Sequence, residues 1–181
     1  MSRGQGPFGT AMKDLRKASF FEPIDGTIEQ LATFLESDQL LLMTTADLHS
    51  ILALGFIESA LLDLGISYSR RILPPNSHMP PDEVNLIPKE DSSSILFIDP
   101  WDRVDTPPQN VMIMSAKPVE VEFNNSSTKR RGRIDVVLQA SAVATSLAPN
   151  GSRTKRCRPY SGCGQWLMES LDTTIDPIHT L

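Results

Sequence analysis

The chain has 181 residues, of which 40% are hydrophobic and 22% are charged, so it is long enough to bury the core of one domain. Two cysteines and three scattered histidines give neither a disulfide framework nor the paired spacing of a zinc site, which argues against both. No apolar run reaches the roughly 18 residues of a membrane span and no signal-peptide core follows the first charges, so we expect a cytoplasmic protein with no membrane partner.

The charged residues are unevenly distributed along the chain. The formal net charge is −5, but residues 128–158 contain eight Lys or Arg and a single Asp. That stretch carries +7 and the remainder of the chain −12. Such asymmetry is typical of an acidic body that bears a local anion-binding patch.

The N-terminal third predicts a helix, a strand and a second helix. Residues 1–22 are Gly-rich and weakly patterned, so we expect a flexible arm there. Apolar residues at helical spacing in residues 25–39 predict a short helix before the first strand. The continuous apolar run 40–43 is typical of a central parallel strand, and residues 50–64 predict a helix that ends at Gly65.

The middle of the chain predicts three further strands and a long loop. Residues 66–73 alternate like a strand with two solvent-facing arginines, which completes a strand–helix–strand crossover. Five prolines among residues 74–94 predict a loop. The apolar runs 94–99 and 110–115 are typical of buried strands, and the first of them ends in an acid.

The last third combines a short strand with two helices. Residues 119–123 predict an edge strand, and the polar, basic residues after them predict a loop. Residues 134–148 have the small and apolar side chains of a helix that lies closely on a sheet. Residues 150–164 predict a loop, and residues 165–171 predict a short final helix.

The order of these elements predicts an α/β fold. We expect a three-layer domain with a mostly parallel sheet of about four to five strands flanked by helices. The domain spans residues 23–171 in this prediction, between the flexible arm 1–22 and a tail at 172–181.

Acids and hydroxyls follow three of the predicted strands. "TTADLHS" (44–50) follows the first strand, "LFIDP" (96–100) ends the middle one, and "IMSAKP" (113–118) ends the third. The order of strand, acid-bearing turn, helix, long loop, strand ending in Asp and further apolar strand resembles the N-terminal domain of the DHH phosphoesterase family, which includes the RecJ nucleases. The resemblance is one of topology, spacing and hydrophobic pattern, and it covers about residues 28–148.

The resemblance implies a site that has lost its metal ligands. In that family a D-x-D-G turn, a middle Asp and an Asp-His-His motif hold two divalent cations about 3.5–4 Å apart, which activate water and clamp a phosphodiester. The vestigial positions of that site in this chain are Thr45, Asp47, Asp99, Ser115, Ala116 and Lys117. Thr45 replaces the first Asp, and Lys117 puts a positive charge where a cation would be bound. The resemblance therefore implies no catalytic residue and no cofactor, or at most one weak Mg²⁺ or Mn²⁺ at Asp47 and Asp99.

These residues also have a purely structural interpretation. Asp47 is suited to cap the helix that follows it, and Asp99 to accept hydrogen bonds from nearby backbone amides at the end of a strand. His49 is predicted to be a surface residue of the first helical turn. Ser50 and Ser115 lack the G-x-S-x-G context of a hydrolase nucleophile.

Two basic clusters flank the helix predicted at residues 134–148. The first contains Lys129, Arg130, Arg131 and Arg133, and the second contains Arg153, Lys155, Arg156 and Arg158. If the clusters converge, they form a phosphate- or nucleic-acid-binding surface whose affinity falls steeply with salt; otherwise they are two solvated loops, and both alternatives stay open. Tyr160 alone lies close by for base stacking, so sequence-specific recognition of single strands is not indicated.

The resemblance implies a catalytically inactive DHH/RecJ-like domain that serves as a scaffold or DNA-binding subunit in replication or repair. By analogy with the inactive RecJ-derived replication factors of archaea and eukaryotes, its partners would be replication proteins such as GINS or the MCM helicase, and single-stranded DNA. A chain of this length is not expected to hold the family's C-terminal domain. The alternatives are a divergent metal-dependent phosphoesterase acting on a small phosphorylated substrate, and an unrelated α/β protein-interaction domain.

Overall fold

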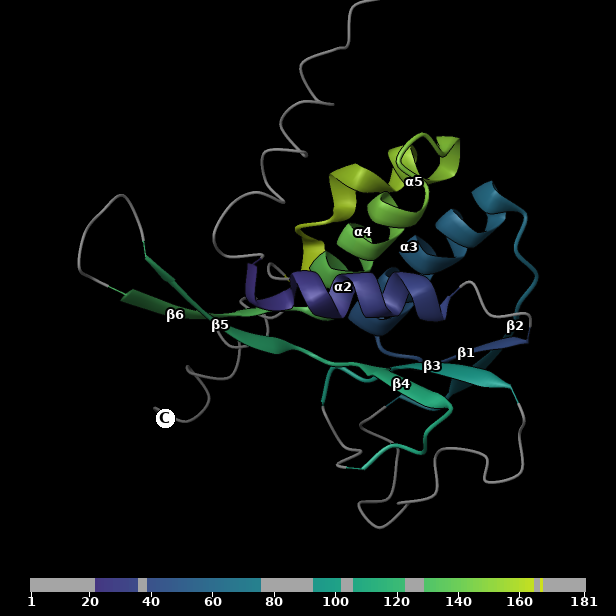
Figure 1. The fold of residues 1–181 in the computed structure, drawn as a ribbon, viewed down its shortest axis with the longest axis horizontal. Coiled ribbons are helices and arrows are strands. Elements are labelled where there is room, and N and C mark those ends of the chain that lie inside the picture. The colour runs from purple at the N-terminus through teal and green to yellow at the C-terminus, as the bar shows by residue number, and fades with distance from the viewer. Residues whose placement is uncertain are drawn as a thin grey trace, which may run out of the picture.

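A computed structural model of the chain describes residues 22–35, 39–75, 93–101, 106–122, 129–164 and 167. These residues form an α/β fold whose main sheet is parallel and has the strand order β2-β1-β3-β4 (Figure 1). Its strands are β1 (Leu40–Thr45), β2 (Ser69–Leu73), β3 (Ser94–Ile98) and β4 (Val111–Met114). The predicted α/β class and the mostly parallel sheet with helices packed against it are confirmed.

The described helices lie together on one side of this sheet (Figure 1). They are α2 (Glu22–Phe34), α3 (Leu48–Leu64), α4 (Val136–Leu147) and α5 (Ser152–Cys157), with a short 3-10 helix, η2 (Arg158–Tyr160), after the last. The helix predicted before the first strand is α2, although it begins three residues earlier than expected. The helix after the first strand begins at Leu48 rather than at Ser50, and Gly65 ends it in the predicted left-handed conformation, with φ 71°.

The sheet buries apolar side chains on both of its faces. Leu42, Ile98 and Met114 point toward the helices and join their apolar faces in one core cluster. Met43 and Phe97 belong to a second cluster on the opposite face, and both are fully buried. Because strand residues alternate between faces, a continuous apolar run is what a sheet covered on both sides requires. The burial is consistent with the three-layer architecture predicted from the sequence.

Two segments differ from the prediction. The expected edge strand is β5 (Lys117–Glu122), which leaves the parallel sheet and pairs antiparallel with β6 (Lys129–Ile134), where a loop was predicted. The predicted loop 150–164 contains α5 and η2. The proline-rich loop lies largely outside the described residues, as do the N-terminal arm, the C-terminal tail and most of the predicted final helix.

Each correction has a physical cause. In β5 and β6, Glu120 pairs with Arg131 and Glu122 with Lys129, so residues of opposite charge occupy opposite positions on the ladder. Helix α5 is short, and the carboxylate that satisfies its first amides comes from Asp63 in the last turn of α3. The partner strand of β6 and the capping carboxylate of α5 both lie outside the segment whose structure they support.

Candidate functional site

The carboxyl ends of three parallel strands bring the predicted site positions to one edge of the sheet. Strand β1 ends at Thr45, β3 is followed by Asp99, and β4 is followed by Ser115. The backbone N–H of Asp99 donates to the carbonyl of Met114 at 3.0 Å, which ties the ends of β3 and β4 together. The structure therefore groups these positions as the sequence predicted, at the edge where α/β folds usually bind ligands.

The hydroxyl groups at this edge are hydrogen-bonded within the protein. Thr45 and Ser50 are fully buried, and their hydroxyl oxygens lie 3.2 Å apart in a mutual hydrogen bond. Lys117 Nζ donates to the hydroxyl of Ser115 at 3.2 Å. Buried hydroxyls are costly without partners, and these contacts supply them from neighbouring side chains.

The two surviving carboxylates differ in their surroundings. Asp99 is fully buried, and its Oδ1 accepts from the backbone N–H of Trp101 at 3.3 Å, as the strand-end interpretation predicts. Asp47 is half-buried and occupies the N-cap position of α3 in an extended conformation, but its side chain does not hydrogen-bond the helix. Its backbone carbonyl accepts from Ile51 N–H at 2.9 Å. The helix-capping interpretation therefore holds for the position of Asp47 and not for its carboxylate.

His49 is not the surface residue that the sequence suggested. Only 7% of it is exposed, and its ring lies edge-on to Trp101, with ring centroids 5.7 Å apart. Burial lowers the pKa of His49, while the carboxylates of Asp47 and Asp135 act in the opposite direction. The net shift is downward, so the imidazole is neutral at pH 7. Nε2 has no hydrogen-bond partner among the described residues.

One important residue of this region has no counterpart in the sequence predictions. Gln139 of α4 is 1% exposed, and its Nε2 donates both to the carbonyl of Ser115 at 2.7 Å and to that of Ile134 at 2.9 Å. It therefore joins the end of β4 to the end of β6 and fixes the base of the hairpin. A polar amide among the small residues of a buried helix was the signal that could have identified it.

Metal binding requires several ligands in one place. Among the residues that the structure describes, no group of three or more His, Cys, Asp or Glu is arranged to hold an ion. At the carboxyl edge, Lys117 lies beside Ser115 at positions where the resemblance would place metal ligands. The hydroxyl, amide and ammonium groups at this edge are hydrogen-bonded to other groups of the protein.

The first basic cluster lies on β6, in the hairpin that extends away from the parallel sheet (Figure 1). Arg131 and Lys129 occupy positions opposite Glu120 and Glu122, whereas Arg133 is exposed opposite Pro118. Strands β5 and β6 together contain five basic and two acidic residues, which gives the hairpin a net charge of +3. The paired glutamates thus reduce the positive charge of this cluster without cancelling it.

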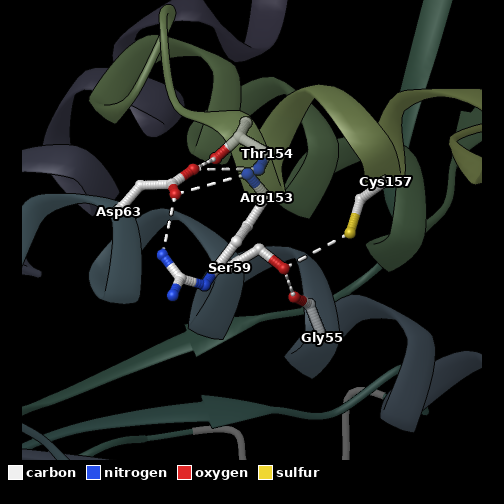
Figure 2. A network of polar contacts seen from close by, with 6 residues as sticks. All are labelled: Gly55, Ser59, Asp63, Arg153, Thr154 and Cys157. Atoms are coloured by element: carbon white, nitrogen blue, oxygen red, sulfur yellow. Dashed lines mark hydrogen bonds and ion pairs between the residues drawn. The ribbon is translucent and has the colours of Figure 1, made fainter.

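The second basic cluster lies on α5 and η2, where two of its four members contact neighbouring elements. Figure 2 shows Arg153 beside Asp63, with Arg153 Nη1 3.3 Å from Asp63 Oδ1. Arg158 Nη2 donates to the carbonyl of Pro149 at 3.1 Å. Lys155 and Arg156 are exposed. A solvated loop was therefore the wrong description of this segment.

Asp63 acts as the N-terminal cap of α5 from another helix (Figure 2). Its Oδ2 accepts from Thr154 N–H at 3.0 Å and from the Thr154 hydroxyl at 3.1 Å, and its Oδ1 accepts from Arg153 N–H at 3.3 Å. The backbone hydrogen bond from Thr154 is the largest cause that lowers the pKa of Asp63. A Cβ at Gly151 would overlap this carboxylate, so glycine is required by the close approach.

The two basic clusters lie at opposite ends of α4. Strand β6 leads directly into the helix at Asp135, whereas α5 follows its C-terminal end and Arg158 is held by Pro149 at that end. Twelve helical residues separate these ends by about 18 Å. The described geometry therefore gives two separate basic surfaces.

Comparison with protein-family models, with curated proteins and with solved structures found no match. Within the described part of the chain, every helix is too short or too polar to cross a membrane.

Proposed function

We propose that this domain is a catalytically inactive, DHH/RecJ-like scaffold in a DNA replication or repair assembly. The observation that carries the proposal is the hydrogen bonding at the carboxyl edge. Thr45 and Ser50 bond each other, and Lys117 bonds Ser115, at positions where the resemblance would require metal ligands. The parallel order β2-β1-β3-β4, with α2 before the first strand, is compatible with that resemblance.

The chemistry at this edge is unsuited to two-metal hydrolysis. Such catalysis needs several anionic or imidazole ligands around two cations a few ångströms apart. Asp47 and Asp99 supply two carboxylates, and the Asp99 carboxylate already accepts the N–H of Trp101. These residues could bind at most one Mg²⁺ or Mn²⁺ weakly, and the domain's role is to bind other macromolecules.

Single-stranded DNA is the nucleic acid that we propose as a ligand, and β6 is the surface that would contact it. The hairpin has a net charge of +3, and β6 contributes four of its basic residues: Lys129, Arg130, Arg131 and, after Gly132, Arg133. Phosphate contacts of this kind do not depend on base sequence and weaken as salt is added. Proposed protein partners are replication proteins such as GINS or the MCM helicase.

An exonuclease assay with Mn²⁺ on 5′-labelled single-stranded DNA tests the inactive state. We expect no turnover by the wild type, and calorimetric titration with Mn²⁺ should give no binding in the micromolar range. Turnover that Asp99→Ala abolishes and Asp25→Ala on α2 leaves unchanged would refute the proposal. Metal binding and turnover on a small phosphorylated substrate would favour a phosphoesterase instead.

DNA binding is tested by fluorescence anisotropy with a labelled oligonucleotide over a salt series. Arg133→Glu on β6 should weaken binding and flatten the dependence of log affinity on log salt, which is about −0.7 per phosphate contact for single strands. Arg156→Glu makes the same charge change on α5 and is the matched control. Equal losses in the two variants would mean that general charge, rather than the hairpin, determines binding.

A further inference from the structure

Strand β2 is an outer strand of the parallel sheet, and solvent reaches most of it. It pairs with β1, and no described strand lies on its other side. Four of its five residues are exposed, including Ile72, a large apolar residue with 47% of its surface accessible. An exposed edge strand is a template for another strand unless something blocks it.

The direction of the backbone groups of β2 follows from one hydrogen bond. The carbonyl of Leu73 accepts from Ala46 N–H at 3.0 Å, so the backbone of Leu73 faces β1. Successive residues of a strand direct their N–H and C=O groups to alternate sides. Arg71 therefore also faces β1, whereas Arg70 and Ile72 direct their N–H and C=O groups outward. These four groups can bond an added strand without disturbing the existing ladder.

The side chains of β2 place basic groups on both faces of this edge. Arg70 and Ile72 pair in register with Leu42 and Thr44, whose face carries the helices, while Arg71 lies on the opposite face. A hollow of about 600 Å³ beside the strand is lined in part by Leu62, Tyr68 and Arg70. Arg70 contacts Glu58 at 3.2 Å, whereas Arg71 is exposed to solvent.

We infer that the edge of β2 binds an extended, acidic segment of a partner protein by strand addition. Acidic side chains of that segment would face Arg71 on one face of the sheet, and apolar side chains would cover Ile72 on the other face, beside the hollow. The inference deepens the proposed scaffold role, because it assigns a binding surface for a protein partner. Main-chain hydrogen bonds would supply affinity, and the alternating side chains would supply selectivity.

The same charges argue against other occupants. Adjacent arginines deter neutral apolar strands, since pairing with one would desolvate the charges without compensation. Antiparallel pairing of two copies of β2 about its centre would set their Arg71 side chains directly opposite each other, and like charges in that position destabilise a ladder. An acidic strand removes both penalties.

The experiment uses the whole chain and a fluorescent peptide of about six residues with alternating Val and Glu, roughly the length of a typical strand. Binding is measured by anisotropy. Ile72→Pro removes an outward N–H that β1 does not use, so the variant should fold, and Ile72→Ala is the matched control that keeps this N–H. Arg71→Glu tests the charge requirement, with Arg156→Glu on α5 as the control at a remote position.

We expect the acidic peptide to bind the wild type and a Val/Lys peptide not to bind. Ile72→Pro and Arg71→Glu should weaken binding at least about tenfold, which is about 1.4 kcal/mol, and the two controls should weaken it less. A peptide N-methylated at alternate residues should also fail to bind the wild type, which tests the same hydrogen bonds even if Ile72→Pro does not fold.

Three outcomes would overturn the inference: no binding of the acidic peptide, equal binding after N-methylation, or a concentration-dependent dimer that Ile72→Pro abolishes. The last outcome would assign the edge to self-association. If the acidic peptide does not bind but DNA binding still depends on the hairpin, only the proposed β2 binding surface is refuted. If the acidic peptide binds but single-stranded DNA does not, the proposed DNA binding is refuted and the β2 surface is not.

Discussion

Replacing Gln139 should destabilise the fold more than most single substitutions in this chain. Its amide nitrogen donates to two carbonyls, those of Ser115 and Ile134, at 2.7 and 2.9 Å. The side chain is 1% exposed, so water does not replace those bonds when the amide is removed. Gln139→Leu keeps a side chain of similar size while leaving both carbonyls without this donor.

The magnitude follows from the two lost bonds. A net contribution of about 1 kcal/mol per hydrogen bond, with a further desolvation cost for each acceptor left buried, gives a loss of about 3 kcal/mol in the free energy of unfolding. Each kcal/mol shifts the melting temperature of a domain of this size by about 2–4 °C, so a decrease of about 6–12 °C is expected for Gln139→Leu.

Urea unfolding followed by far-UV circular dichroism measures this loss. Ser141→Ala on the same helix is the matched control, because Ser141 is fully buried and its hydroxyl has no partner among the described residues. Removing that hydroxyl should change stability by less than about 0.5 kcal/mol or increase it. If Gln139→Leu and Ser141→Ala cost the same, the double hydrogen bond of Gln139 is not what holds the hairpin base.

Gln139→Glu adds a pH dependence with a defined sign. The ionised carboxylate cannot donate and would face two carbonyl oxygens, so folding should raise the pKa of the introduced carboxyl above its unfolded value of about 4.3. The folded state then binds more protons than the unfolded state just above that pH. The stability of Gln139→Glu should therefore approach that of the wild type below about pH 4 and fall further behind it as pH rises.

Three other predictions concern the helix caps and the buried histidine. The pKa of Asp63 is lowered in the folded state. Its contribution to stability is therefore present above the unfolded pKa and is lost as the pH falls through the folded pKa. In urea titrations at several pH values, Asp63→Asn should reduce this loss of stability at low pH. A Cβ at Gly164 would overlap the carboxylate of Asp135, which caps α4, so Gly164→Ala should cost about 1–2 kcal/mol, whereas Gly162→Ala has open space and should be nearly neutral in the same assay. Because the pKa of His49 is lowered in the folded state, protonation of the unfolded state near pH 6.5 and below should reduce the free energy of unfolding. His49→Phe should remove this pH-dependent loss. An unchanged pH profile in that variant would contradict a buried, neutral imidazole.

The elements that local pattern determines were predictable from the sequence. The apolar runs at 40–43, 94–99 and 110–115 are the buried strands β1, β3 and β4, because a strand covered on both faces needs apolar residues at every position. The helical spacing and Gly65 likewise located α3 and its end. In each case the residues that form the element also determine its burial.

The elements that distant residues determine were not predictable in this way. The residues of β6 are almost all charged or glycine, and the strand forms by pairing antiparallel with β5. Helix α5 depends on a carboxylate at Asp63, some ninety positions earlier in the chain. The burial of His49 depends on Trp101, which follows a different strand. A pattern read along one segment contains no information about such partners.

The same distinction applies to the candidate site. The sequence correctly grouped Thr45, Asp99 and Ser115 at one edge, because strand direction alone fixes where the ends of parallel strands meet. It could not reveal that the hydroxyls there bond each other and a lysine. An edge whose hydroxyl groups are satisfied internally has few of them left to bind a ligand. The outward-facing backbone groups of β2 and the exposed Arg133 of β6 have no such internal partners in the described structure, so binding capacity in this domain is better sought along its strands than at their carboxyl ends.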